Sequence, residues 1–203
     1  MKRGKFIVLE GPDKSGKSTH AARLVHELRA RGRKVVHTRE PGGTAFAEAI
    51  RSILLSNEYT VHPLAEILLY EAARAQHTHG LILPALRRGE VVLSERYTMA
   101  TLAYQGGGRH LAMPLVRRLN RIATSGLVPD LTVVLDIPGS CLKTRDRRRK
   151  LDRLERESLA FHRRVREAYR RLARREPKTA LVDADRPKEA VHADLLALIE
   201  KVL

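Results

Sequence analysis

The N-terminal part of the chain carries a glycine-rich loop between an apolar run and a helical pattern. Residues 11–18 read Gly-Pro-Asp-Lys-Ser-Gly-Lys-Ser, which matches the G-x-x-x-x-G-K-[ST] pattern of phosphate-binding loops. The apolar run 5–9 predicts a strand before the loop, and Leu24, Val25 and Leu28 predict a helix after it. This context predicts a strand, a loop that cradles phosphates, and a helix whose N-terminus favours their negative charge.

The loop residues have distinct expected roles in binding a nucleoside triphosphate. Lys17 is expected to reach the β- and γ-phosphates, and the Ser18 hydroxyl to ligate Mg²⁺. Asp13 can face the group that accepts a phosphoryl, although an aspartate that only forms a turn stays an alternative. The expected nucleotide-binding residues are Gly11, Pro12, Asp13, Lys14, Ser15, Gly16, Lys17, Ser18 and Thr19.

Beyond the loop, predicted strands alternate with predicted helices. We expect further strands at 34–38, 91–94, 131–136 and 179–183, and helices at 45–56, 63–88, 111–125, 154–174 and 188–202. The alternation predicts an α/β fold in which a five-stranded parallel sheet is flanked by helices on both faces and binds ligands at the carboxyl ends of its strands. The length of 203 residues and the 43% hydrophobic content fit a single domain over 1–203.

The net charge of +16 is concentrated in one stretch of the chain. Residues 143–175 hold 15 Lys/Arg and 5 Asp/Glu, which supplies 15 − 5 = +10. Aromatic residues make up only 4% of the chain, so polyphosphate binding is favoured over nucleic-acid binding, and a nucleic-acid-binding ATPase stays a remote alternative. The lone Cys141 is expected to be a small apolar residue. The N-terminus resembles neither a signal peptide nor a membrane span, so we expect a cytoplasmic protein without a membrane partner.

A phosphate-binding loop alone is compatible with kinases, GTPases, motor ATPases and helicases, but an Asn-Lys-x-Asp stretch for guanine is missing. Four further stretches, in order, resemble the bacterial thymidylate kinase family. They are Thr-Arg-Glu-Pro-Gly-Gly-Thr at 38–44, Leu-Leu-Tyr-Glu-Ala-Ala-Arg-Ala-Gln-His at 68–77, the segment 95–109 with Glu-Arg-Tyr and Ala-Tyr-Gln-Gly-Gly-Gly-Arg, and Leu-Asp-Arg-Leu-Glu-Arg-Glu at 151–157. With the loop, the resemblance spans nearly the whole chain.

The resemblance implies a P-loop kinase fold with a short mobile lid at about 143–154. It also implies phosphorylation of dTMP by ATP, a Mg²⁺ cofactor and a homodimer without a nucleic-acid partner. A kinase of another nucleoside monophosphate or of a deoxynucleoside stays an alternative. In the proposed reaction, a phosphate oxygen of dTMP attacks the γ-phosphorus in line.

The resemblance also assigns residues to the acceptor site. Arg96 matches the arginine that holds the acceptor phosphate and bridges it to the donor, and Tyr70 matches the aromatic residue that stacks on the base. Arg74 resembles the residue that contacts a thymine carbonyl, and Tyr104 one that crowds the sugar 2′-position. The remaining expected substrate contacts are Thr101 and Gln105 at the base edge, with Arg39, Glu40 and Arg51 lining the pocket. Without the resemblance, such arginines are usually solvated and such tyrosines usually pack in the core.

Two features depart from the family pattern. Glu95 stands where the family usually has Asp, so a magnesium site at Ser18 and Glu95 must accommodate one extra methylene. Lys14 occupies the loop position where one branch of the family has a catalytic arginine, while the other branch uses lid arginines. The cationic groups expected to act in catalysis are therefore Lys14, Lys17 and Arg96, with Arg147, Arg148, Arg149 and Arg153 in or beside the lid. Lys14, the lid arginines, or both together could neutralise the charge on the transferred phosphoryl group.

Overall fold

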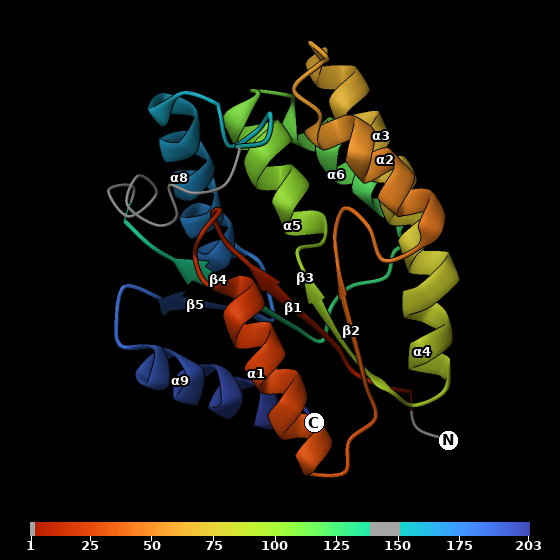
Figure 1. Ribbon diagram of the computed structural model, residues 1–203, viewed down its shortest axis with the longest axis vertical. Coiled ribbons are helices and arrows are strands. Elements are labelled where there is room, and N and C mark those ends of the chain that lie inside the picture. Colours follow the sequence, from red (N-terminus) through yellow and green to blue (C-terminus); the bar gives the residue numbers. More distant parts are fainter. Residues whose placement is uncertain (1–2, 139–150) are drawn as a thin grey trace.

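The computed structural model describes residues 3–138 and 151–203. Five strands form one parallel sheet in the order β2-β3-β1-β4-β5 (Figure 1). The strands are β1 (Phe6–Glu10), β2 (Val35–Arg39), β3 (Val91–Glu95), β4 (Leu131–Asp136) and β5 (Thr179–Asp183). The five-stranded parallel sheet predicted from the alternating pattern is confirmed, and each strand lies within one residue of its expected position.

Helices connect the strands on both sides of the sheet. They are α1 (Lys17–Ala30), α2 (Ala45–Leu55), α3 (Pro63–His77), α4 (Leu83–Arg87), α5 (Thr98–Thr101), α6 (Met113–Ala123), α8 (Leu159–Arg175) and α9 (Lys188–Glu200), with π-helical segments η1 (Thr78–Ile82) and η2 (Leu102–Gly108). The long helical pattern at 63–88 corresponds to α3, η1 and α4 in direct succession. No helix in the described part of the chain is both long and apolar enough to cross a membrane.

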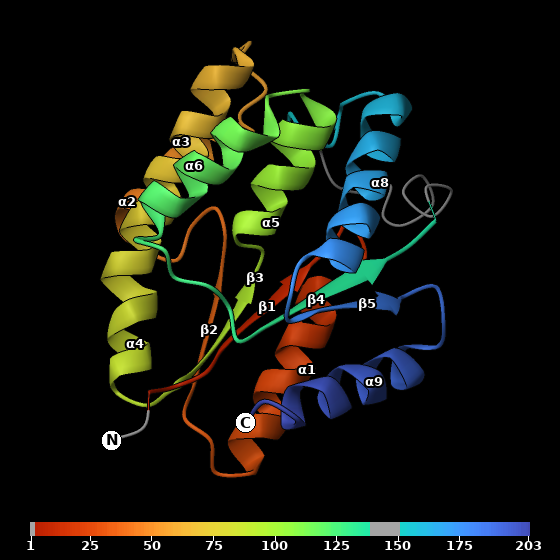
Figure 2. The same ribbon diagram turned by 180° about the vertical axis from the view of Figure 1, so that it is seen from behind.

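Alternate residues of β1 point to opposite faces of the sheet, and both faces are buried. Ile7 and Leu9 pack with apolar residues of α1 and α9. Phe6 and Val8 pack with Ile82 and with apolar residues of α4 on the other face. Figures 1 and 2 show α1 and α9 on one side of the sheet and the larger group of helices on the other. Burial on both faces explains why β1 has no polar–apolar alternation.

Helical structure at α5 and η2 is not evident from the sequence, because glycines weaken any helical pattern. The three glycines at 106–108 instead permit close packing: a Cβ on Gly107 would lie 2.6 Å from the Cβ of Ala168, and one on Gly108 would lie 2.5 Å from Phe161. The helix expected at 154–174 begins later, at Leu159, where the Ser158 side chain accepts a hydrogen bond from the backbone N–H of Phe161. As a result, η2 lies directly against α8.

Candidate functional site

The glycine-rich loop connects the carboxyl end of β1 to the N-terminus of α1, as the motif predicts. Gly11 has φ 133°, and a Cβ there would lie 2.3 Å from the carbonyl oxygen of Leu135. Gly16 caps α1 in the left-handed region, with φ 92°. Both positions therefore require glycine, for space at Gly11 and for backbone conformation at both. The N-terminal N–H groups of α1 face the open end of the loop, where they can bind an anion.

Lys17 is the first residue of α1 and is buried. Its Nζ donates to the carbonyl oxygens of Gly11 and Pro12 at 3.0 and 2.7 Å, so the side chain folds over the loop. Burial and the positive charge of Arg96 lower the pKa of Lys17 to about 7, although nearby carboxylates oppose the shift. A bound polyphosphate would add further negative charge beside this buried cation.

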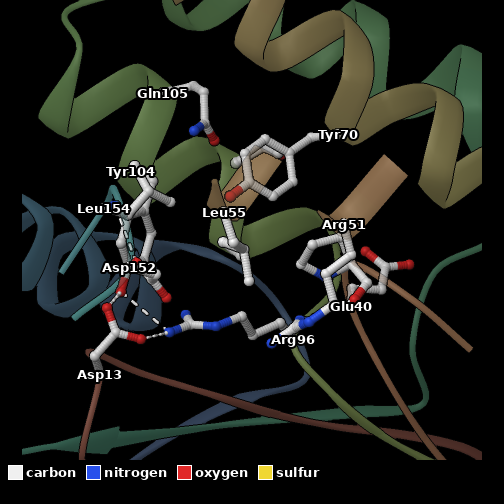
Figure 3. Close-up of a pocket in the computed structure, with 13 residues that line it drawn as sticks. Asp13, Glu40, Arg51, Leu55, Tyr70, Arg96, Tyr104, Gln105, Asp152 and Leu154 are labelled. Carbon is white, nitrogen blue, oxygen red and sulfur yellow. Dashed lines mark hydrogen bonds and ion pairs between the residues drawn. The ribbon is translucent and has the colours of Figure 1, made fainter. Parts of the chain in front are cut away.

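Asp13, Arg96 and Tyr104 form a compact cluster beside the loop (Figure 3). Arg96 donates from Nη2 to Asp13 Oδ1 at 2.5 Å and from Nη1 to the carbonyl oxygen of Gly11 at 3.0 Å. The Tyr104 hydroxyl donates to Asp13 Oδ2 at 2.7 Å, and the Arg96 guanidinium lies 4.9 Å from the centre of the Tyr104 ring. Burial alone raises the pKa of Asp13, but Arg96 and Lys17 outweigh it and lower the pKa to about 2. Asp13 is therefore ionised, and Arg96 holds its carboxylate in a fixed orientation.

Glu95 ends β3 on the other side of the loop. Its Oε2 accepts a hydrogen bond from Ser18 Oγ at 2.5 Å, and its Oε1 lies 3.0 Å from His37 Nε2 on β2. Burial raises the pKa of Glu95, but the hydrogen bonds from His37 and Ser18 lower it further than burial raises it. The longer side chain at this position therefore still reaches Ser18, which brings a carboxylate and a hydroxyl together as two hard oxygen donors. His37 has no motif to mark it in the sequence.

Two adjoining pockets open at this end of the sheet. The loop pocket is lined by Asp13, Lys14, Gly16, Lys17, Ser18, Thr19, Arg39, Glu40, Arg51, Glu95, Arg96, Asp152 and Glu155. The inner pocket, drawn in Figure 3, is lined by Asp13, Glu40, Pro41, Arg51, Leu55, Tyr70, Arg96, Ala100, Thr101, Tyr104, Gln105, Asp152 and Leu154. Five residues line both: Asp13, Glu40, Arg51, Arg96 and Asp152. The two pockets therefore meet at a junction that contains the Asp13–Arg96 ion pair.

The structure brings most of the expected acceptor-site residues into the inner pocket. Tyr70, Thr101, Tyr104 and Gln105 line it together, from α3, α5 and η2. Figure 3 shows the Gln105 amide near the ring of Tyr70 at the end of the pocket away from Asp13. An aromatic face beside an amide is the arrangement that a planar heterocycle with a polar edge requires.

Arg74 is placed differently. It is 1% exposed and is absent from the lining of both pockets. Its guanidinium donates to Glu40 Oε2 at 2.8 Å, to Glu71 Oε1 at 2.7 Å and to the carbonyl oxygen of Tyr97 at 2.9 Å, with further hydrogen bonds to the side chains of Thr101 and Asn120. Arg74 therefore lies one layer behind the wall, bonded to the pocket residues Glu40 and Thr101.

The remaining basic residues lie around the junction. Arg39 lines the loop pocket and makes two hydrogen bonds with Glu48, at 2.8 and 3.0 Å. Arg51 lines both pockets and donates to the carbonyl oxygen of Pro41 at 2.9 Å. Lys14 lines the loop pocket with φ 62°. These cations surround the place where negatively charged groups from two ligands would approach each other.

Most of the lid expected at 143–154 lies outside the described residues. The expected catalytic arginines Arg147, Arg148 and Arg149 lie outside them too, as does Cys141. Arg153 is described, and it bonds away from the loop pocket: Nη1 donates to Glu66 Oε2 at 2.6 Å and Nε to the carbonyl oxygen of Leu54 at 3.0 Å. Its neighbour Asp152 lines both pockets. Arg153 thereby anchors the chain that enters the site beside Asp152.

Sequence reasoning did not identify several residues that shape the site. They are Glu10, His37, Pro41, Leu55, Ala100, Asp152, Leu154 and Glu155. Glu10 is fully buried at the end of β1 and accepts hydrogen bonds from the backbone of Tyr97 and from the Tyr169 hydroxyl, at 2.8 and 2.9 Å. Its position directly before Gly11 was the one available signal, because a carboxylate that ends a buried strand needs partners.

Comparison with known proteins gives a consistent result. The family model described as thymidylate kinase matches residues 9–195. The chain is 47% identical to the thymidylate kinase of Deinococcus radiodurans over 99% of this chain and 98% of the relative. It is 50% identical to that of Methylococcus capsulatus, over 100% and 98% of the two chains, and 49% identical to that of Pelotomaculum thermopropionicum, over 99% and 95%. These matches include the residues that line both pockets. The chain therefore belongs to the thymidylate kinase family.

Proposed function

We propose that the protein transfers the γ-phosphoryl group of ATP directly to the phosphate of dTMP. The observation that supports this most strongly is the pair of pockets that share Asp13 and Arg96. One pocket contains a phosphate-binding loop, and the other has an aromatic wall with polar side chains at its far end. An enzyme that transfers a phosphoryl group directly from one phosphorylated ligand to another requires such a junction. Relatives of nearly the same length carry the name thymidylate kinase.

ATP is the proposed ligand of the loop pocket. The N–H groups at the start of α1 would bind the β-phosphate, and Lys17 would move from the carbonyl oxygens of Gly11 and Pro12 to the β- and γ-phosphates. Lys14 and Arg39 line the same pocket and add positive charge. As negative charge spreads over the transferred group, Lys17 at the phosphates and Arg96 at the junction would stabilise it.

The inner pocket would bind dTMP with its phosphate at the junction. Tyr70 would stack on the base, while Thr101 and Gln105 would contact its polar edge. Arg96 and Arg51 would hold the acceptor phosphate, because guanidinium groups pair well with phosphate oxygens. No strong general base is needed, since a phosphate monoester is already ionised near neutral pH. Tyr104, whose ring packs beside Arg96, would lie against the sugar.

Ser18 and Glu95 fit a bound Mg²⁺. Magnesium is commonly held by one or two protein oxygens together with substrate phosphates, and this pair faces the loop pocket 2.5 Å apart. The metal would supply charge neutralisation at the phosphates. His37 would keep Glu95 oriented through Oε1.

Acceptor-dependent ADP release tests the function. We expect dTMP to be used far better than dUMP, dCMP, dAMP and dGMP, and better than thymidine. Preference for another monophosphate or for a nucleoside would favour the alternative kinases. ATPase activity that DNA stimulates, with DNA binding that falls steeply as salt rises, would instead support a nucleic-acid-dependent ATPase. The expected cytoplasmic location stays a prediction that cell fractionation can check.

We also propose a homodimer formed through α2, α3 and α6. α3 contacts both of the other helices, and large apolar side chains are exposed on all three: Phe46, Ile53, Leu64, Leu68, Leu115 and Ile122. Exposed apolar residues that gather on adjacent helices commonly mark an interface. In sedimentation velocity we expect a dimer that Leu68→Lys dissociates, whereas Leu181→Lys, at an exposed apolar residue of β5, leaves it intact. A monomeric wild-type protein would contradict the proposal.

Proton uptake should accompany ATP binding. In the free protein the pKa of Lys17 is about 7, so at about pH 8 most Lys17 side chains are neutral. Bound phosphates raise the pKa of Lys17, so at about pH 8 ATP binding should be accompanied by the uptake of nearly one proton. Because binding takes up a proton, ATP affinity should fall as the pH rises above 7. Calorimetry in buffers of different ionisation enthalpy measures the uptake. Lys17→Ala should abolish both the uptake and phosphoryl transfer while dTMP still binds, whereas Lys201→Ala, at an exposed residue, should change neither.

Replacement of Glu95 tests the metal site. Glu95→Gln removes one negative charge but keeps the side-chain length, so the Mg²⁺ concentration for half-maximal rate should rise by roughly tenfold or more. Binding of Mn²⁺ with ADP, followed by electron paramagnetic resonance, should weaken in parallel. Glu90→Gln, at an exposed ion pair with Arg88, is the matched control and should leave both values unchanged. Unaltered metal dependence in Glu95→Gln would exclude Glu95 from the site.

Replacement of Arg74 distinguishes support of the wall from direct contact with the base. Arg74→Ala leaves the carboxylates of Glu40 and Glu71 buried without their cation, so the free energy of unfolding should fall by about 3–5 kcal/mol. Arg117→Ala breaks an exposed ion pair with Glu176 and should cost under about 1 kcal/mol. Denaturant unfolding measures both. Near-normal stability with a raised KM for dTMP would instead support direct contact with a base carbonyl.

A further inference from the structure

Glu66 lies on α3 behind the far end of the inner pocket and is fully buried. Three side chains from three parts of the chain donate to its carboxylate. Gln105 Nε2 lies 2.8 Å from Oε1, and Arg153 Nη1 lies 2.6 Å from Oε2. Arg109 donates from Nε to Oε1 at 3.2 Å and from Nη2 to Oε2 at 3.1 Å. With donors on both oxygens, the carboxylate has no freedom to rotate.

The charge state of Glu66 determines which end of the Gln105 amide faces it. Burial raises the pKa of Glu66, but the hydrogen bonds from Arg109, Gln105 and Arg153 lower it by more, so the group is ionised. An ionised carboxylate can only accept hydrogen bonds. The NH₂ group of Gln105 must therefore face Glu66, because the flipped amide would place its oxygen against a carboxylate oxygen. The Gln105 carbonyl oxygen is then the end that remains for a ligand.

This orientation matters because Gln105 lines the inner pocket, while Glu66 does not. Within residues 3–138 and 151–203, no hydrogen bond links a protein donor to Gln105 Oε1. The pocket thus offers a hydrogen-bond acceptor of fixed direction, close to the ring of Tyr70 (Figure 3). Thymine and uracil carry an N–H donor at position 3, which matches an acceptor, whereas cytosine carries an unprotonated nitrogen there.

We propose that Glu66 is a positioning residue for base specificity: it fixes the Gln105 amide with its carbonyl oxygen toward the base, and thereby selects thymine and uracil against cytosine. The inference rests on the proposed function, because it assumes that a pyrimidine nucleotide binds in the inner pocket. Glu66 itself contacts no substrate. Without its negative charge, the amide could present either end, and cytosine would no longer meet a fixed acceptor.

The test compares three acceptors in wild type and Glu66→Gln. A neutral amide at position 66 both donates and accepts, so it permits either orientation of Gln105. The ratio of kcat/KM for dTMP to that for dCMP should fall by about 10- to 100-fold, since an unmatched polar contact in a built site is strongly disfavoured. The ratio of dTMP to dUMP should not change, because both bases carry the same N–H. A merely structural defect would lower all three activities together.

Two further variants separate orientation from general loss of packing. Arg109→Lys keeps a positive charge beside Glu66 but loses the paired hydrogen bonds of the guanidinium, and it does not touch Gln105, so it should lower stability and keep the dTMP:dCMP ratio. Gln105→Met should lower that ratio as Glu66→Gln does, and the double variant should lower it no further, because both changes remove the same contact. Circular dichroism shows whether Glu66→Gln folds. If it does not, Glu66→Asp takes its place, because its shorter side chain keeps the negative charge but moves it away from Gln105.

The outcomes distinguish this inference from the function on which it rests. Wild type that fails to phosphorylate dTMP overturns both. If wild type phosphorylates dTMP but the Glu66 variants keep the dTMP:dCMP ratio, only the role of Glu66 is overturned. The same conclusion follows if the Glu66 variants lower the dTMP:dUMP ratio as much as the dTMP:dCMP ratio. A selective fall in discrimination against dCMP in the Glu66 variants, absent from Arg109→Lys, supports the proposed role of Glu66.

Discussion

The ion pair between Arg96 and Asp13 is the interaction around which both pockets are built. Arg96 follows β3, and its backbone has φ 69°, which turns the side chain across the end of β1. There the guanidinium binds the Gly11 carbonyl oxygen, the Asp13 carboxylate and the hydroxyls of Tyr104 and Tyr169. One side chain therefore connects the phosphate-binding loop to η2 and α8. Because two ligands would approach it from opposite sides, a donor and an acceptor would lie next to each other without further movement of the sheet.

Buried carboxylates in and behind the pocket walls hold this arrangement in place. Glu10 binds the backbone after β3, Glu40 binds Arg74 and His77, and Glu66 binds Gln105, Arg109 and Arg153. Each of these glutamates accepts hydrogen bonds from more than one group, as burial of a polar side chain requires. Pocket residues such as Gln105 are thus held by buried partners, and in the proposed account specificity depends on these partners as well as on the pocket wall.

The sequence was sufficient to predict the sheet and the loop, because buried parallel strands and a glycine-rich phosphate loop leave strong local patterns. The contacts between individual side chains could not be predicted in the same way. Tyr70 and Arg74 are four residues apart on α3, so the prediction that both face one side is reasonable. Arg74 nevertheless bonds to Glu40, which approaches from the end of β2, and no local pattern reveals that contact. His37 and Glu66 escaped notice for the same reason. The glycines of η2 hid a helical segment whose close packing against Ala168 and Phe161 depends on them.

The central claim is that the phosphoryl group passes directly between two ligands that meet at Arg96, and its stereochemical course tests this most directly. ATP made chiral at the γ-phosphorus with oxygen isotopes and sulfur would be incubated with dTMP, and the configuration of the product's terminal phosphorus determined. A single in-line transfer predicts inversion. Net retention would require an even number of transfers, such as through a phosphorylated side chain, and would contradict a direct junction of the two pockets.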